Sequence, residues 1–358
     1  MKLQLKLMCA VFLMMAVVFA RCAGKPAKKT PEAPYTVGVI DSANVGTTYL
    51  YLLDEDLQET DTLRCPYHGV GSFGSTPVQI EDGVLYVQLA GNTMKPNKCA
   101  VAAMNLQTGE WKEYSFDGGI IEDFRVNEHG IFAFSNRAEP SIEYCPFEER
   151  ENVSLKLEAE SPGLCISVDG YGVYFISEET ADTEGYDAKE EKYVLCRADI
   201  KDGSQEKLLD VTEELAGSTL GYAQWHGGEM YIPHGDKLCV YNPHKNEMRQ
   251  IGLPGKEACQ VLIDQGRVYV VDCEVNSSET DIYCFCPETG EIEAAYHIAE
   301  NTLQSYLRDG TFYMLQQEPV AKVLKYQLTE DGSCRKLSEA IIEAETDDDH
   351  RISDMFVK

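Results

Sequence analysis

Short runs of alternating apolar and polar residues, broken by glycine and asparagine, dominate the chain from Tyr35 onward. Residues 264–289 are the clearest example. They read as a turn at Gln265-Gly266, a strand over 267–272, a polar loop, a second strand over 281–286, and a closing turn. Alternation with period two predicts half-buried β-strands, and no segment shows a long period of 3.6 residues. The pattern therefore predicts a chain of strands with few helices.

This strand–loop–strand unit recurs, and each copy has a glycine just before its second strand. A tight hairpin favours a residue that tolerates positive φ, which explains the glycine. The anchor glycines are Gly83, Gly130, Gly172, Gly228, Gly266 and Gly310. They define six full units at about 75–118, 119–159, 162–211, 218–253, 256–298 and 301–341. Repeats of this length are typical of propeller blades.

A seventh unit is split between the two ends of the chain. Residues 35–66 contain three strand patterns and lack a first strand. Residues 351–358 supply one further strand, at the point in the repeat where a first strand is due. Pairing the two ends would remove two exposed sheet edges. We therefore predict an all-β fold over residues 35–358: a single seven-bladed propeller of four-stranded antiparallel blades, closed by its C-terminal strand. Six or eight blades are the alternatives.

The units resemble Kelch-type, YVTN-type and quinoprotein-type blades of bacterial secreted propellers. Asp82–Tyr86 (DGxLY) and Val240–Pro243 (VYNP) carry the resemblance. The chain departs from the Kelch pattern, which has a Gly-Gly doublet after the second strand, and from the regular tryptophan ladder of quinoproteins, since only Trp111 and Trp225 are present. The resemblance implies a propeller and assigns no subfamily.

The first 22 residues have the layout of a secretory signal peptide: lysines at the start, then an apolar run from Leu7 to Ala20. Cys22 is a lipidation candidate, because its surroundings resemble a bacterial lipoprotein signal; Arg21 stands where that signal has a small residue. Residues 23–34 read as a linker. We expect a secreted or membrane-anchored protein of the cell envelope, with any membrane tether at the N-terminus only.

The net charge of −29 over 358 residues limits the partner classes. So acidic a chain repels a phosphate backbone, which excludes nucleic acid as a partner; cations or a basic protein surface fit better. The 13 cysteines include no CxxC pair, so neither a zinc knuckle nor a thioredoxin-type site is indicated. Many lie in apolar strand patterns and read as core residues, with one or two disulfides as the alternative.

No motif names a reaction, so we assign no catalytic, cofactor-binding or metal-binding residue. The seven histidines form no HExxH motif. His226 and His234 flank one hairpin, and we expect their rings to approach one mouth of the ring. Residues 69–74 are rich in glycine but lack the Lys-Ser/Thr ending of a phosphate-binding loop.

Three loops between second and third strands, at 90–98, 177–192 and 273–279, should rim one opening of the ring. The longest is acidic, and weak calcium binding is its alternative role, although its spacing is not that of an EF-hand. The partner-binding candidates are Asn92, Lys95, Glu178, Asp182, Glu184, Tyr186, Asp187, His226, His234 and Asn276.

These features favour an extracytoplasmic binding or scaffold propeller without enzymatic activity, which presents one face to a protein or glycan partner. The alternatives are a propeller enzyme, such as a polysaccharide lyase or hydrolase with its site in the central mouth, and an envelope assembly factor. An enzyme requires convergent ionisable residues at the mouth, a glycan binder an exposed aromatic pair, and a protein scaffold a contiguous patch.

Overall fold

The protein is described from a computed structural model. The described residues are 30–71, 78–89, 99–117, 121–135, 140–148, 151–158, 167–180, 191–215, 221–255, 257–272, 278–317, 319–343 and 350–358. Residues 1–29, with the expected signal peptide, lie outside them. Among the described residues, no helix has the length and apolar character needed to cross a membrane.

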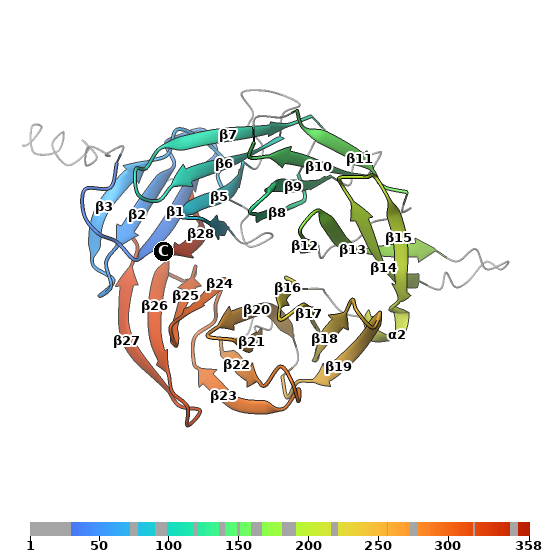
Figure 1. The fold of residues 1–358 in the computed structure, drawn as a ribbon. Coiled ribbons are helices and arrows are strands. Elements are labelled where there is room, and N and C mark those ends of the chain that lie inside the picture. The colour runs from blue at the N-terminus through green and yellow to red at the C-terminus, as the bar shows by residue number, and fades with distance from the viewer. Residues whose placement is uncertain are drawn as a thin grey trace, which may run out of the picture.

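Seven four-stranded antiparallel sheets form a closed ring, as the repeat pattern predicts (Figure 1). Blade 1 consists of β28 (His350–Val357), β1 (Val37–Ala43), β2 (Tyr49–Leu53) and β3 (Glu59–Arg64). Blade 2 consists of β4 (Gln79–Glu81), β5 (Val84–Leu89), β6 (Cys99–Asn105) and β7 (Trp111–Phe116). Blade 3 consists of β8 (Asp123–Asn127), β9 (Gly130–Ser135), β10 (Ser141–Pro146) and β11 (Val153–Lys156).

Blade 4 consists of β12 (Ser167–Asp169), β13 (Gly172–Thr180), β14 (Glu191–Asp199) and β15 (Gln205–Asp210), and the short helix α2 (Thr212–Leu215) follows it. Blade 5 consists of β16 (Gln224–His226), β17 (Glu229–His234), β18 (Lys237–Asn242) and β19 (Glu247–Gly252). Blade 6 consists of β20 (Ala258–Asp264), β21 (Arg267–Asp272), β22 (Thr280–Phe285) and β23 (Ile292–Ile298). Blade 7 consists of β24 (Gln304–Arg308), β25 (Thr311–Gln316), β26 (Lys322–Leu328) and β27 (Cys334–Ile341).

Four of the six anchor glycines, Gly83, Gly228, Gly266 and Gly310, have positive φ in the hairpins between first and second strands, whereas Gly130 and Gly172 begin their second strands without a positive φ. At Asp82-Gly83 the φ angles are 47° and 72°, and at Gln265-Gly266 they are 49° and 79°. Two consecutive positive φ values give a two-residue turn whose twist matches the flanking strands. These turns lie at one end of the ring, with the turns between third and fourth strands; we call this end the turn face. The strand ends that lead into the other connections, within and between blades, lie at the opposite end, the loop face.

The C-terminal strand closes the ring. β28 pairs antiparallel with β1, from Val37 opposite Val357 to Ala43 opposite His350. β28 is therefore the innermost strand of blade 1, which confirms both the seven-bladed fold and the predicted closure. The core consists of apolar layers between neighbouring blades; between blades 6 and 7, for example, Val271 and Ile282 pack against Phe312, and all three are buried.

The cysteines partly follow the expectation of a packing role. Cys65, Cys196, Cys239 and Cys284 are buried, Cys99, Cys145, Cys286 and Cys334 are half-buried, and none of these eight thiols forms a disulfide. Cys259, at the start of β20, is disulfide-bonded. Both the packing role and the disulfide alternative therefore occur in this chain.

Candidate functional site

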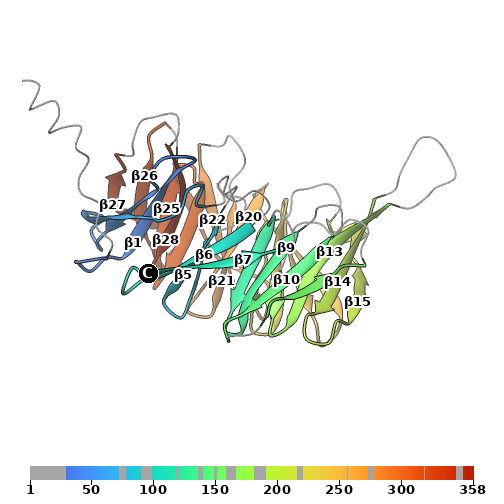
Figure 2. The same cartoon turned by 90° about the horizontal axis from the view of Figure 1, so that it is seen from above.

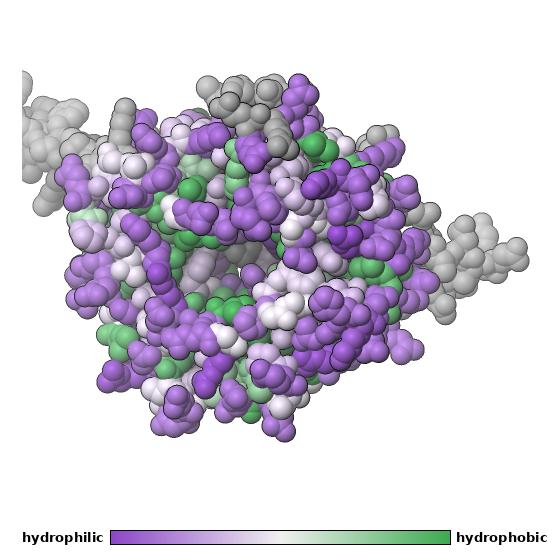
Figure 3. Space-filling view, in the orientation of Figure 1, coloured by the Kyte–Doolittle hydropathy of each residue, from purple (hydrophilic) through white to green (hydrophobic). Residues whose placement is uncertain are grey.

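The centre of the ring is a channel with a cavity of about 770 Å³. Figure 3 shows the ring hollowed at its centre, with apolar side chains around the opening. The innermost strands of several blades form its wall. Apolar residues such as Val126, Val168 and Leu262 lie beside the polar residues Arg125, Tyr222 and Gln260. Propellers commonly use such a mouth for ligands because loops and strands of several blades converge on it.

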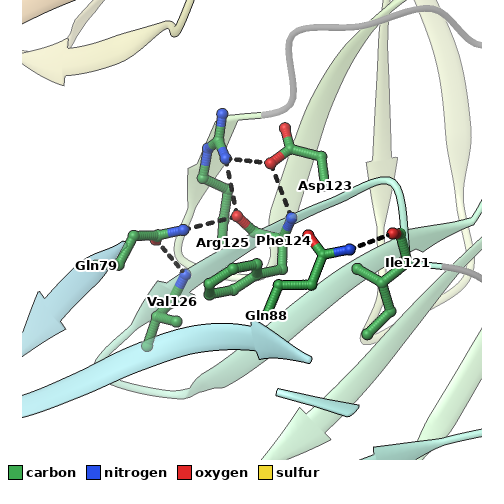
Figure 4. A network of polar contacts seen from close by, with 7 residues as sticks. All are labelled: Gln79, Gln88, Ile121, Asp123, Phe124, Arg125 and Val126. Carbon is green, nitrogen blue, oxygen red and sulfur yellow. Dashed lines mark hydrogen bonds and ion pairs between the residues drawn. The ribbon is translucent and has the colours of Figure 1, made fainter. Parts of the chain in front are cut away.

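An ion pair in β8 lies in the wall of the channel (Figure 4). Nη1 of Arg125 lies 2.6 Å from Oδ1 of Asp123, and the two side chains are only 11% and 10% exposed. The same carboxylate oxygen accepts the backbone N–H of Phe124 at 2.8 Å, and Nη1 of Arg125 donates to the carbonyl of Phe124 at 2.8 Å. The pair is therefore held rigidly on its own strand.

Glutamine side chains join neighbouring blades beside this pair. Nε2 of Gln79, in β4, donates to the carbonyl of Phe124 at 2.7 Å, and Oε1 accepts the N–H of Val126 at 2.9 Å. Gln88, in β5, donates to the carbonyl of Ile121 at 2.6 Å. The exposed edge of an inner strand has backbone groups without ladder partners. The amide of Gln79 bonds two such groups, the carbonyl of Phe124 and the N–H of Val126, as the backbone of a neighbouring strand would.

The same device recurs farther round the ring. Nε2 of Gln260, in β20, donates to the carbonyl of Ser305 in β24 at 2.9 Å. Gln304, in β24, donates to the side-chain carboxylate of Asp354 and accepts the backbone N–H of Met355, both in β28. We call Gln79, Gln260 and Gln304 the glutamine clamps. They bind inner strands together around the channel, so much of the polar lining serves the ring itself.

Two tyrosines complete the polar lining. The guanidinium of Arg125 lies 5.9 Å from the ring centre of Tyr222, across blades. Burial, followed by the charge of Asp123, raises the pKa of Tyr222 above its usual range, and burial with the charge of Asp354 does the same for the pKa of Tyr306. Both phenols are therefore neutral near pH 7, and the channel wall combines the Asp123–Arg125 pair and the carboxyl groups of Glu81 and Glu128 with neutral phenols and amides.

This arrangement supplies the convergent ionisable groups that an enzyme would need at the mouth. The hydrogen bonds described above for Asp123 and Arg125 nevertheless stay within the wall, which is typical of a structural pair. Among the described residues, no group of three or more histidine, cysteine or acidic side chains is placed to hold a metal ion.

The predicted site residues within the described ranges do not come together. His226 ends β16 on the turn face, where Nε2 lies 3.2 Å from the carbonyl oxygen of Gly266. His234 ends β17 on the loop face and is 2% exposed. The two histidines lie at opposite ends of β17, so the expectation that their rings meet at one mouth is wrong. Glu178 lies in β13, opposite Tyr193 of β14.

The remaining candidates lie outside the described residues. They are Cys22, Asn92, Lys95, Asp182, Glu184, Tyr186, Asp187 and Asn276. The strands that lead into three of their loops, β5, β13 and β21, all end at the loop face, as the repeat phase predicts.

Sequence reasoning missed the channel lining, because its members come from different blades. One signal was present. Gln79 stands four residues before its anchor glycine, and Gln260 and Gln304 stand six residues before theirs. Both spacings are even and therefore place the amides on the same face of the first strand. A glutamine recurring at this phase indicates an inter-blade bond.

No protein-family model matches the chain, and no curated protein matches it. Solved structures do resemble it in fold. Apo AztD from Citrobacter koseri has a TM-score of 0.57 at 10% identity, covering 91% of this chain and 98% of that chain. Another structure of Citrobacter koseri AztD has a TM-score of 0.56 at 10% identity, covering 90% and 97%. At such low identity the likeness shows the propeller fold alone.

Proposed function

We propose that the protein is an extracytoplasmic binding or scaffold propeller without enzymatic activity, which presents its loop face to a protein or glycan partner. The observation that carries the proposal is an arm formed by β13 and β14. Each strand has nine residues, whereas the middle strands of the other blades have five to seven. Their pairing continues to Thr180 opposite Glu191, and Figure 2 shows the two strands reaching past their neighbours.

The base of this arm is well anchored. The backbone N–H of Tyr193 donates to Oγ1 of Thr212, in α2, at 3.0 Å, and Lys192 pairs with Asp210 at 3.1 Å. Lys207 forms an ion pair with Glu179. A firmly held, acidic projection is suited to contact another molecule, because little order has to be gained on binding. The N-terminal signal pattern supports an extracytoplasmic place.

A capture experiment tests the proposal. The chain without residues 1–22 is used as bait on material from its native envelope, next to a variant in which residues 181–190 are replaced by Asn-Gly. We expect a specific partner that the arm variant no longer retains. The matched control carries Glu247→Gln, Glu291→Gln and Glu330→Gln on the turn face, which removes the same net negative charge and should retain the partner. Equal capture by all three proteins would contradict a role for the arm.

The enzyme alternative is favoured by one observation, the Asp123–Arg125 pair beside Tyr222 in the channel. It predicts turnover of an envelope polysaccharide that is lost in Arg125→Gln. Retention of partner capture by Arg125→Gln, with no turnover in either protein, would leave binding as the only supported function.

A further inference from the structure

A second cavity, of about 470 Å³, opens on the turn face between blades 3 and 4. It lies away from the arm of the proposed function. Its lining comes from the β8–β9 and β12–β13 turns, from β10, the start of β11 and described residues between them, and from the two residues that follow β14. The binding function proposed for the loop face uses none of these residues.

The cavity has preformed aromatic walls. The rings of His129 and Tyr171 stack with centroids 4.4 Å apart and planes 3° from parallel. Tyr144 stands edge-on to Tyr171 at 6.0 Å, and its hydroxyl donates to the carbonyl of His129 at 2.9 Å. The two turns are also joined, since Nδ2 of Asn127 donates to the carbonyl of Gly170 at 2.8 Å. The rings are therefore positioned before any ligand arrives.

The rim of the cavity is acidic. Glu128, Glu148 and Glu151 line it, and Lys201 is the one lysine or arginine among its described lining residues. The side chain of Glu128 is 66% exposed. Together with the net charge of −29, this rim attracts cations and disfavours anions. Aromatic faces beside carboxylates are a favourable environment for an ammonium or guanidinium group.

The molecule itself contains an example of this contact. Nζ of Lys201 lies 5.0 Å from the ring centre of Tyr171. The ring thus already accepts an ammonium group, supplied by an exposed side chain of the same chain. Such a contact at an exposed site is weak, and a cation from another molecule can replace it.

We propose that this aromatic cleft binds a cationic side chain, a lysine or arginine, of a basic peptide segment in a partner protein. The incoming cation takes the face of Tyr171 that Lys201 covers in the free protein, and the rim glutamates hold it. The site is separate from the loop face and does not depend on the function proposed for it.

Calorimetric titration of the chain without residues 1–22 tests this. The ligand is the peptide acetyl-Gly-Lys-Gly-Lys-Gly-amide, and the same peptide with norleucine for lysine is the comparison. We expect binding of the lysine peptide only. Tyr171→Leu, which keeps apolar packing but removes the ring, should weaken binding by roughly 3–10-fold, in line with one cation–π contact. Glu128→Gln with Glu151→Gln should weaken it by a similar factor. Circular dichroism confirms that each variant is folded.

Lys201→Gln provides the sharpest test, because it should strengthen binding, by about 2–5-fold, by freeing the ring face. Lys237→Gln, the same charge change at the loop face, should leave the affinity unchanged, as should Glu213→Gln with Glu343→Gln. The proposal is overturned if Lys201→Gln and Lys237→Gln bind alike, if the norleucine peptide binds equally well, or if cellohexaose binds in place of the peptide, which would make the cleft a glycan site.

Discussion

The side-chain amide of Gln304 donates a 2.7 Å hydrogen bond to Oδ1 of Asp354, which lies 50 residues later in the chain. Its carbonyl oxygen accepts the backbone N–H of Met355 at 2.8 Å. Gln304 begins β24 and Asp354 lies in β28, so one side chain bonds blade 7 to the strand that closes the ring. Both residues are buried, with 4% and 0% exposure. The closure thus depends on side chains as well as on the pairing of β28 with β1.

Replacing Gln304 by alanine should lower the free energy of unfolding by roughly 2–4 kcal/mol, because it leaves a buried carboxyl and a buried N–H without this partner. Chemical denaturation measures the change. Gln58→Ala, at an exposed turn position, is the matched control and should change stability by less than about 0.5 kcal/mol. Equal effects of the two substitutions would show that the clamp contributes nothing to closure.

Deleting residues 350–358 should unfold the domain or lower its melting temperature strongly. The deletion exposes the edge of β1 and removes Met355 and Phe356, both 0% exposed. Losing each large buried side chain costs about 2–5 kcal/mol, against a total stability of roughly 5–15 kcal/mol. A truncated protein that melts at the wild-type temperature would rule out closure by β28.

A circular permutant shows whether the effect of the deletion comes from the loss of β28 or from the new position of the chain end. The backbone N–H of Lys358 bonds the carbonyl of Thr36 at 2.8 Å, so a short Gly-Ser linker can join the ends of blade 1. New ends placed between His244 and Lys245, in an exposed turn, keep β28 in the ring. We expect this permutant to fold and to melt near the wild-type temperature.

Gly38 and Phe356 should be coupled energetically. A Cβ atom on Gly38 would lie 2.1 Å from Cζ of Phe356, so the ring occupies the space that a side chain would need. Gly38→Ala should cost about 1–3 kcal/mol through overpacking, and Phe356→Ala about 3–5 kcal/mol through a cavity. The double variant should be less destabilised than the sum of the two, by about 0.5–3 kcal/mol. Strict additivity in a denaturation cycle would contradict this packing.

His297 should titrate above the ordinary histidine pKa of 6.5, because Nδ1 lies 2.9 Å from Oδ1 of Asp281, and this hydrogen bond raises the pKa of His297. A raised pKa in the folded state adds stability below the unfolded value, which is lost as the pH rises through the folded value. The pair is largely exposed, so water and salt screen it and the effect on stability is small. NMR titration of the imidazole measures the pKa directly.

Asp281→Asn provides the comparison for that titration. Without the carboxylate, the pKa of His297 should return toward 6.5. A pKa of His297 that does not move in Asp281→Asn would mean that the ion pair is absent in solution.

The sequence by itself determined the blades, because their signals are local. Period-two alternation marks the strands, and anchor glycines such as Gly83 and Gly266 mark hairpins through their own positive φ angles. The missing first strand at residues 35–66 and the surplus strand at the C-terminus also predicted the closure. These features depend on neighbouring residues or on counting strands, so no knowledge of distant contacts was needed.

Only the tertiary structure decided which side chains meet. Asp123 and Arg125 lie on one strand, but Tyr222 reaches them from another blade, and Gln304 reaches Asp354 across the closing seam. His226 and His234, eight residues apart, lie at opposite ends of a strand that separates them. The channel and the aromatic cleft form only when the blades pack together in the ring, because contacts between blades depend on how each sheet is oriented against the next. The local pattern of apolar and polar residues does not specify that orientation.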